Sequence, residues 1–161
     1  MTELRFRLAE RADAARLNAA LAQLSDALND PHRATDDDLA RAGWGANPVF
    51  RAILAEDADG EVAGAALYSP LMSTSRGMTM VFVSDLWLAP ARRGSGLGRR
   101  LLGAVCRDAR AAWGAQAIKL AVYHSSEGAR AFYDRLGFRP ASGATEMVLD
   151  PEKCKALEAN G

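Results

Sequence analysis

The chain has 161 residues, and its 49% hydrophobic content is enough to bury the core of one domain. Twenty basic residues balance twenty acidic ones, which argues against nucleic acid or an anionic membrane as a partner. No apolar run approaches a membrane span, the first residues do not resemble a signal peptide, and Cys106 and Cys154 form no metal or disulfide pattern. We therefore expect a cytoplasmic protein without a metal site.

The N-terminal part predicts one strand and two helices. Apolar and charged residues alternate over 3–8, which indicates a half-buried strand. Leucines spaced three and four apart predict an amphipathic helix from Ala14 to about Leu28. Thr35 and Asp38 have the spacing of a capping box, so a second, short helix is expected to start there.

Three strands are expected next. Residues 49–56 and 61–68 predict two strands joined by a hairpin turn at 57–60, where Asp-Gly is the strong signal. Residues 69–77 are polar and include a proline, so we expect a loop there. Residues 78–88 are almost continuously apolar, which is typical of a strand inside a sheet.

A glycine-rich loop follows, and a helix begins near Gly98 and ends at Gly114. Its expected buried stripe is Leu101, Leu102, Val105, Cys106, Ala109 and Trp113. Alternation predicts a strand over 117–123.

Ser125 or Ser126 is expected to cap the last helix, which ends at Gly137 with Phe138 folded back on it. A short strand over 145–149 and a loosely held, charged tail over 151–161 complete the chain. This order of elements predicts one mixed α/β domain over residues 1–150.

The loop between the long strand and the next helix is the most informative segment. Gly94, Gly96 and Gly98 stand at alternate positions, which lets the backbone turn its N–H groups inward. The helix start adds unpaired donors and the positive end of a dipole. The pattern predicts a site for a phosphate or pyrophosphate group.

Several ligand classes use such a loop. A nucleotide P-loop requires a lysine after the glycines, and none follows here. A dinucleotide fingerprint would place glycine where Arg99 stands. A tight loop with solvated arginines is the plain structural alternative.

Two motifs together resemble the GNAT superfamily of CoA-dependent N-acyltransferases. Arg93-Gly94-Ser95-Gly96-Leu97-Gly98 is similar to its Arg/Gln-x-x-Gly-x-Gly/Ala pyrophosphate motif, and Asp85-Leu86-Trp87-Leu88 before it resembles the fourth strand. Residues 126–138 resemble the helix that carries Asn-x-x-Ala-x-x-Phe-Tyr and ends in Leu-Gly-Phe, with Ser126 in place of the asparagine. The resemblance implies a mostly antiparallel mixed sheet, helices on both faces, and a splay between the fourth and fifth strands.

The resemblance also implies the cofactor and its contacts. Acetyl-CoA would lie in the splay, with its pantetheine along the fourth strand and its pyrophosphate on the glycine loop. The expected cofactor-binding residues are Leu86, Trp87, Leu88, Arg93, Gly94, Ser95, Gly96, Leu97, Gly98, Arg99, Ser126 and Phe132. Arg100 is expected to be a solvated helix residue.

Acyl transfer to an amine needs a deprotonated amine, a donor for the developing oxyanion, and an acid for the departing thiolate. The resemblance places the oxyanion donor at a backbone N–H near Leu88 and the acid at Tyr133. Core packing is the alternative role of Tyr133, and Tyr68 and Tyr123 are weaker candidates.

The base is less well defined by the sequence. Asp85, which we expect on one face with Val81, Val83 and Trp87, is either the general base or a structural acceptor at a strand bulge. His124 is a second base candidate and otherwise an exposed loop residue. Ser84, His124 and Asp85 are the expected substrate-binding residues.

Segments before the long strand resemble diamine (spermidine/spermine-type) acetyltransferases, in which a Glu-Asp pair occupies the positions of Ser84 and Asp85. The missing carboxylate favours a smaller amine or an amino acid over a polycation. The resemblance further suggests a homodimer. The alternatives are an acetyltransferase for protein N-termini or lysines and a non-catalytic CoA-binding module.

Overall fold

The computed structural model describes residues 3–141 and 143–159, which form two compact units, Met1–Val122 and Tyr123–Gly161. The first unit holds a five-stranded sheet in the order β1-β2-β3-β4-β5. All neighbouring strands are antiparallel except β4 and β5, which are parallel. The strands are β1 (Arg5–Leu8), β2 (Arg51–Glu56), β3 (Val62–Ser73), β4 (Met78–Leu88) and β5 (Ala117–Leu120).

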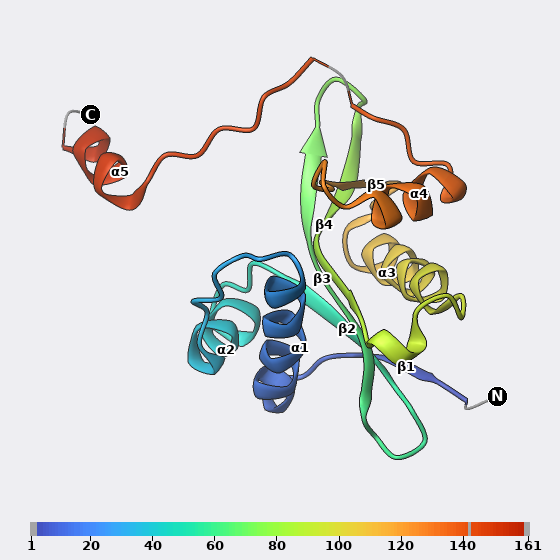
Figure 1. The fold of residues 1–161 in the computed structure, drawn as a ribbon. Helices are drawn as coiled ribbons and strands as arrows, with labels where there is room; N and C mark the ends of the chain where they lie inside the picture. The colour runs from blue at the N-terminus through green and yellow to red at the C-terminus, as the bar shows by residue number, and fades with distance from the viewer. Residues whose placement is uncertain (1–2, 142, 160–161) are drawn as a thin grey trace. The chain divides into compact units, whose positions relative to one another are not determined.

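Helices cover both faces of this sheet (Figure 1). One face packs against α1 (Ala14–Ala27) and α2 (Asp36–Trp44), which follow the short 3-10 helix η1 (Arg11–Asp13). The other face packs against α3 (Leu97–Trp113). The mixed sheet and its two helical layers confirm the predicted fold class.

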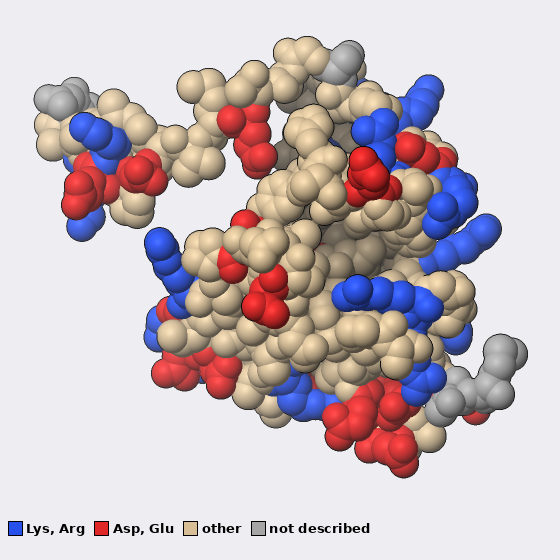
Figure 2. Space-filling model, in the orientation of Figure 1, with Lys and Arg blue, Asp and Glu red and all other residues tan. Residues whose placement is uncertain are grey.

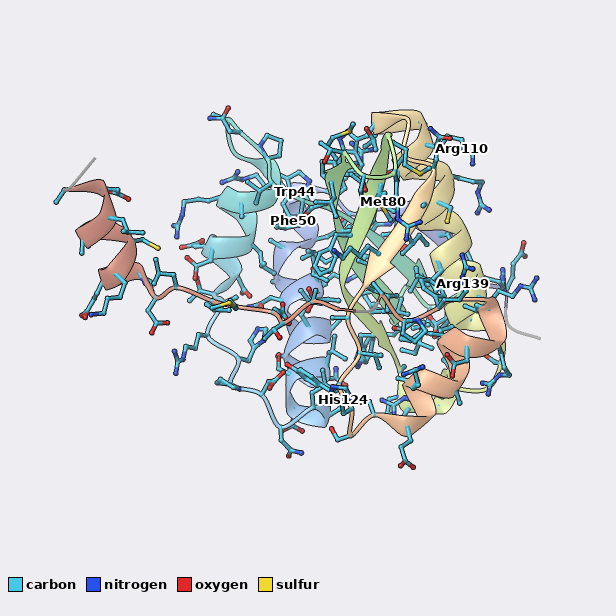
Figure 3. The ribbon with its side chains drawn as sticks, turned by 90° about the horizontal axis from the view of Figure 1, so that it is seen from above. Trp44, Phe50, Met80, Arg110, His124 and Arg139 are labelled. Carbon is cyan, nitrogen blue, oxygen red and sulfur yellow. The ribbon has the colours of Figure 1, made fainter. Side chains whose placement is uncertain are left out.

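The face under α1 and α2 holds a continuous apolar core. Its buried side chains are Ala9, Leu17, Ala20, Leu21, Leu39, Phe50, Ala52, Leu54, Ala65 and Trp87. Trp44 at the end of α2 meets Phe50 edge to face, with 5.6 Å between the ring centres (Figure 3). Thr35 and Asp38 form the predicted capping box, which fixes where α2 begins.

On the opposite face, one carboxylate joins α3 to the sheet. Asp108 of α3 accepts a hydrogen bond from the Tyr68 hydroxyl at 2.6 Å and pairs with the Arg51 guanidinium at 2.7 Å. These contacts hold the pKa of Asp108 below its usual range against the opposing effect of burial. The helix that starts at the glycine loop is therefore fixed to β2 and β3.

Two expectations in the middle of the chain are wrong. Residues 69–73 continue β3 instead of forming a loop, because β2 pairs with β3 only as far as Tyr68 and leaves Pro70 on an open edge that needs no N–H donor. Cys106 is exposed, so it does not belong to the buried stripe of α3. The inward face of that helix centres on Leu101 and Val105 and includes Ala104.

The second unit contains α4 (Glu127–Leu136) and α5 (Pro151–Glu158). Gly137 adopts a left-handed conformation, and the N–H of Phe138 donates to the Tyr133 carbonyl at 3.1 Å, as the predicted helix end requires. The strand expected over 145–149 is wrong, because these residues pair with no strand of the described chain and leave Met147 87% exposed. The charged segment expected to be a loose tail forms α5.

Charged side chains of both signs meet around the β2–β3 hairpin. Figure 2 shows acidic side chains gathered near the tip of this hairpin, with basic side chains on either side of them. Arg16 pairs with Glu56 at 2.8 Å, and Arg92 lies 3.4 Å from Asp57. Within the described residues, no helix is long and apolar enough to cross a membrane.

Candidate active site

A β-bulge in β4 decides which way Asp85 faces. Leu67 pairs with Asp85 but Tyr68 pairs with Val83, so Ser84 is an extra residue in β4. Tyr68 reaches Asp108 on α3, whereas Leu67 packs against the core under α1. Because paired residues share a face, Asp85 lies on the α1 side and Val83 on the α3 side.

This arrangement corrects one prediction. Asp85 shares its face with Trp87, as expected, but not with Val81 and Val83, because the bulge interrupts the alternation between them. The Ser84 hydroxyl donates a hydrogen bond to the Asp85 carboxylate with an Oγ–Oδ2 distance of 2.7 Å. Ser84 is exposed and Asp85 is half-buried, so the pair is accessible from solvent.

Beyond the bulge, β4 has one edge that the described strands leave uncovered. β5 pairs with β4 only from Met80 to Val83, whereas β3 pairs with it to Leu88. The Ala89 N–H donates to Ala63, and alternation along an antiparallel ladder then turns the N–H and C=O groups of Leu86 and Leu88 away from β3. Two N–H and two C=O groups therefore face the gap that β5 leaves open.

The loop after β4 is curled, not extended. A short turn, η2 (Pro90–Arg92), leads into Gly94 and Gly96, whose φ angles are 74° and 79°. These left-handed conformations are accessible to glycine at little cost. Leu97 then begins α3, with Gly96 at its N-cap.

The backbone donors of this loop are available to a ligand. In the described chain, no backbone hydrogen bond outside the helices and strands is donated by a loop N–H from Gly94 to Gly96. The first N–H groups of α3, from Leu97 to Arg99, have no preceding helical turn to bind. Six consecutive amides thus lie at the positive end of a 17-residue helix, an arrangement that suits an anion, and we call this segment the glycine cradle (residues 94–99).

Arginines border the glycine cradle. Arg93 and Arg99 are exposed, and Arg93 Nε lies 3.4 Å from the Leu88 carbonyl, on the uncovered edge of β4. Arg100, expected to be a solvated helix residue, is exposed and lies over the Phe6 ring, 4.8 Å from its centre. Ser95 donates to the Arg92 carbonyl at 2.6 Å and tightens the turn.

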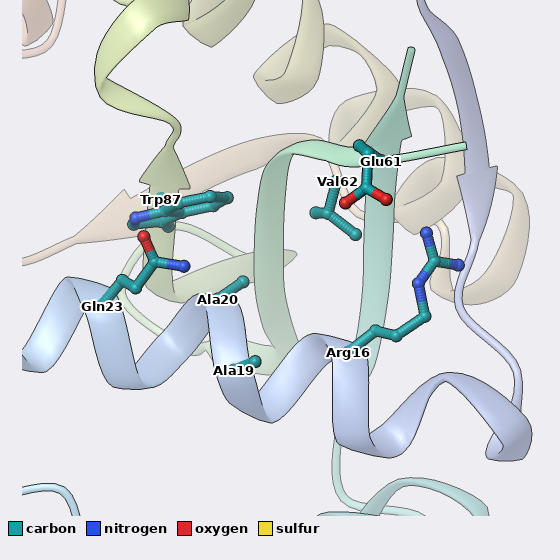
Figure 4. Close-up of a pocket in the computed structure, with 7 residues that line it drawn as sticks. All are labelled: Arg16, Ala19, Ala20, Gln23, Glu61, Val62 and Trp87. Atoms are coloured by element: carbon teal, nitrogen blue, oxygen red, sulfur yellow. The ribbon is translucent and has the colours of Figure 1, made fainter. Parts of the chain in front are cut away.

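A hollow that was not predicted from the sequence lies between α1 and the sheet (Figure 4). Its volume is about 200 Å³, and its lining residues are Arg16, Ala19, Ala20, Gln23, Glu61, Val62 and Trp87. Trp87 places this hollow on the same face of β4 as Asp85. Only the helical spacing of Arg16, Ala20 and Gln23 could have indicated a shared surface on α1.

The second unit carries the remaining predicted residues. The Tyr133 ring packs against two aromatic rings, with its centre 5.1 Å from that of Phe132 and 5.4 Å from that of Phe138. Burial raises the pKa of the Tyr133 phenol. Ser126 is the N-cap residue of α4 without a side-chain capping bond, and His124 is exposed in the segment before α4 (Figure 3).

The first unit thus brings together Ser84 and Asp85 at the bulge, the uncovered edge of β4 and the glycine cradle. All three lie along one continuous segment, residues 84–99. Tyr133, Phe132, Ser126 and His124 belong to the second unit. Among the described residues, no group of three or more His, Cys, Asp or Glu side chains is placed to hold a metal ion.

The chain is similar to known proteins in sequence and in structure. The sequence model of the acetyltransferase (GNAT) family matches residues 18–138. A thialysine N-epsilon-acetyltransferase from Sus scrofa is 28% identical over 153 residues, covering 89% of both chains.

Solved structures share the fold at low sequence identity. An integron cassette protein from the mobile metagenome of V. cholerae has a TM-score of 0.78 and 17% identity and covers 98% of both chains. An aminoglycoside N-acetyltransferase in complex with CoA has a TM-score of 0.74 and 16% identity, covering 92% of this chain and 96% of that one. An aminoglycoside acetyltransferase from an uncultured soil metagenomic sample, in complex with sisomicin, has a TM-score of 0.73 and 11% identity, covering 91% and 97%.

Proposed function

The chain belongs to the acetyltransferase (GNAT) family, and we propose that it transfers the acetyl group of acetyl-CoA to a primary amine of a small molecule by direct attack. Its class is that of an acetyl-CoA-dependent N-acetyltransferase.

The residues of the first unit fit the cofactor. A diphosphate needs several convergent donors, and the glycine cradle offers unpaired amides at the start of α3 beside Arg93 and Arg99. Ser95 tightens the turn of this loop through its bond to the Arg92 carbonyl, and Gly98 lies in the first turn of α3. When bound, acetyl-CoA supplies an activated acetyl thioester.

The uncovered edge of β4 is the observation that carries the proposal. Leu86 and Leu88 present peptide groups that an extended pantetheine arm can pair with as an added strand would. One of these N–H groups is the donor that stabilises a developing oxyanion. Because only residues 89–93 separate Leu88 from the glycine cradle, one continuous segment can hold both the pantetheine arm and the pyrophosphate of the cofactor.

Two side chains would move the protons. Asp85 accepts the proton that an alkylammonium, with a pKa near ~10, must lose before its nitrogen can attack. Tyr133 donates a proton to the departing thiolate, and its raised pKa keeps the phenol protonated at neutral pH. Phe132 and Ser126 would contact the pantetheine arm, and Ser84 and His124 would border the acceptor.

Two relatives support a small amine as the acceptor. The name of the Sus scrofa relative specifies acetylation of the ε-amine of thialysine, and the soil-derived structure holds the amine sisomicin. Asp85, on the face with the hollow lined by Trp87 and Glu61, supplies negative charge for an ammonium group. A homodimer and a cytoplasmic location remain predictions.

Acetyl-CoA turnover tests the proposal. The purified protein is incubated with acetyl-CoA and a panel of monoamines, diamines, amino acids and aminoglycosides, and free thiol is followed over time. We expect at least one small amine to be acetylated and the product to gain 42 Da on mass spectrometry, roughly the mass of an acetyl group less a proton.

Other outcomes would identify the alternatives. Modification of peptide N-termini or lysines, with no small amine accepted, would indicate a protein acetyltransferase. CoA binding without turnover on amines or peptides would indicate a non-catalytic binding module. Either result would refute the small-molecule assignment.

A further inference from the structure

We propose that Ser84 is a positioning residue that fixes the Asp85 carboxylate for proton removal, and this inference rests on the proposed function. Ser84 is the extra residue of the β4 bulge, so it exists in the ladder without a partner on β3. Its hydroxyl donates to Asp85 Oδ2 at 2.7 Å. The bulge thus supplies both the direction of the carboxylate and the donor that holds it.

The contact leaves one carboxylate oxygen for chemistry. Within the described residues, Asp85 Oδ2 receives the Ser84 hydrogen bond and Oδ1 receives none. A hydrogen bond to a charged oxygen is short and directional, so it restricts rotation of the carboxylate. Oδ1 is then the oxygen that points a lone pair at an incoming ammonium group.

The chemical step balances when both protons of the nitrogen are counted. A proton passes from the acceptor ammonium to Asp85 Oδ1, and the freed nitrogen lone pair forms a bond to the thioester carbonyl carbon. The carbon–sulfur bond then breaks, the thiolate takes a proton from the proposed acid, Tyr133, and the nitrogen loses its second proton to the resulting phenolate, which leaves a neutral amide, a thiol and protonated Asp85. Ser84 keeps its own proton throughout, because it acts only through Asp85.

A bulged strand without this serine would present the carboxylate less rigidly. Leu67, opposite Asp85, packs against the core under α1 and offers no side-chain donor. Among the described residues, Ser84 is the one whose hydroxyl holds the Asp85 carboxylate. Removing that hydroxyl should release the carboxylate and leave the packed core unchanged. A threonine at this position retains the hydroxyl and suits a strand.

A double-mutant cycle on the full chain tests the inference. Ser84→Ala, Asp85→Asn and the double variant are compared in steady-state turnover of the amine that the wild type accepts. Ser84→Ala is expected to lower kcat about tenfold with little change in the KM for acetyl-CoA, and to have no further effect in the Asp85→Asn background. Ser84→Thr is expected to restore most of the activity, and Ser73→Ala on β3 is the matched control without effect.

The outcomes separate this inference from the proposed function. If the wild type acetylates no amine, the proposed function fails. If the wild type is active but Ser84→Ala changes only the acceptor KM, Ser84 serves only to bind the substrate and the inference is wrong. Additive losses in the double variant, or full activity in Asp85→Asn, would also overturn it.

Discussion

Tyr133 combines two properties at the scale of a single residue. It packs against Phe132 and Phe138, and it carries the only hydroxyl among these three rings. Its aromatic packing does not depend on the hydroxyl, so the two roles can be separated by one substitution.

Tyr133→Phe should lower kcat by roughly 100-fold, because a positioned acid contributes about that factor, while CoA affinity and unfolding temperature stay close to wild type. Steady-state turnover assays measure the effect on kcat, and calorimetric titration with CoA measures the effect on CoA affinity. Tyr123→Phe is the control, since Tyr123 is 52% exposed and should leave turnover unchanged. A Tyr133→Phe enzyme with wild-type kcat would show that packing is the only role of this residue.

Individual residues were predicted well where one backbone conformation is required. Gly96, Gly114 and Gly137 all have positive φ angles at the turns where the sequence placed them. Ser84 was not recognised as a bulge, because an extra residue in a strand changes no apolar pattern until its partner strand is known. That single residue turned Asp85 to the face opposite Val83.

At the scale of elements, an ionic cluster joins β1, η1, α1 and β2. Arg7 pairs with Asp13 at 2.7 Å and with Glu56 at 2.6 Å, and Arg16 also reaches Glu56. Asp13 is only 6% exposed. Hydrogen bonds from Arg7 lower the pKa of Asp13 to about 2 and also lower the pKa of Glu56.

The cluster should make stability depend on acid pH. A carboxyl whose pKa is lowered in the folded state stabilises the protein when the pH is above its unfolded-state pKa, near 4. This contribution is lost as the pH falls toward the folded-state pKa of about 2. For Asp13 it amounts to about 2 kcal/mol. Urea unfolding between pH 5 and pH 2.5, roughly spanning that window, should show a fall in the free energy of unfolding. Asp13→Asn should make this fall smaller, whereas Asp59→Asn, at the exposed turn, should leave it unchanged.

The packing of α2 on the core gives a second test at this scale. A Cβ at Gly43 would lie 2.6 Å from Phe50 Cζ, which is buried under the helix. Gly43→Ala should therefore lower the free energy of unfolding by about 1–3 kcal/mol. Gly103→Ala in α3, where the nearest atom is 3.7 Å away, should raise it by about 0.5–1 kcal/mol. Equal effects of both substitutions in urea unfolding would contradict the packing.

Elements were predicted where their own residues determine them. The capping box at Thr35 correctly predicted where α2 begins, and the apolar run over residues 78–88 correctly predicted both ends of β4. Residues 69–73 and 145–149 were misassigned for opposite reasons. Pairing with β4 extends β3 through Pro70, whereas Met147 and Val148, which favour a strand by composition, have no strand partner on the described chain.

At the scale of the molecule, the sequence predicted the fold class because two motifs far apart in the chain belong to one family. The curl of the glycine cradle was predictable from its own residues, because Gly94 and Gly96 can adopt the positive φ angles that the turn requires. The hollow lined by Gln23, Glu61 and Trp87 was not, because it forms between elements that meet only in the folded sheet.

The central claim is that the glycine cradle binds the pyrophosphate of CoA, and calorimetric titration with CoA tests it most directly. Gly96→Asp places an anion where the phosphates would lie and should weaken CoA binding at least ~30-fold, or about 2 kcal/mol. Gly77→Asp in the β3–β4 turn, with a similar φ of 63° and open space around it, should bind CoA as the wild type does. Wild-type affinity in Gly96→Asp, or equal losses in both variants, would contradict the account.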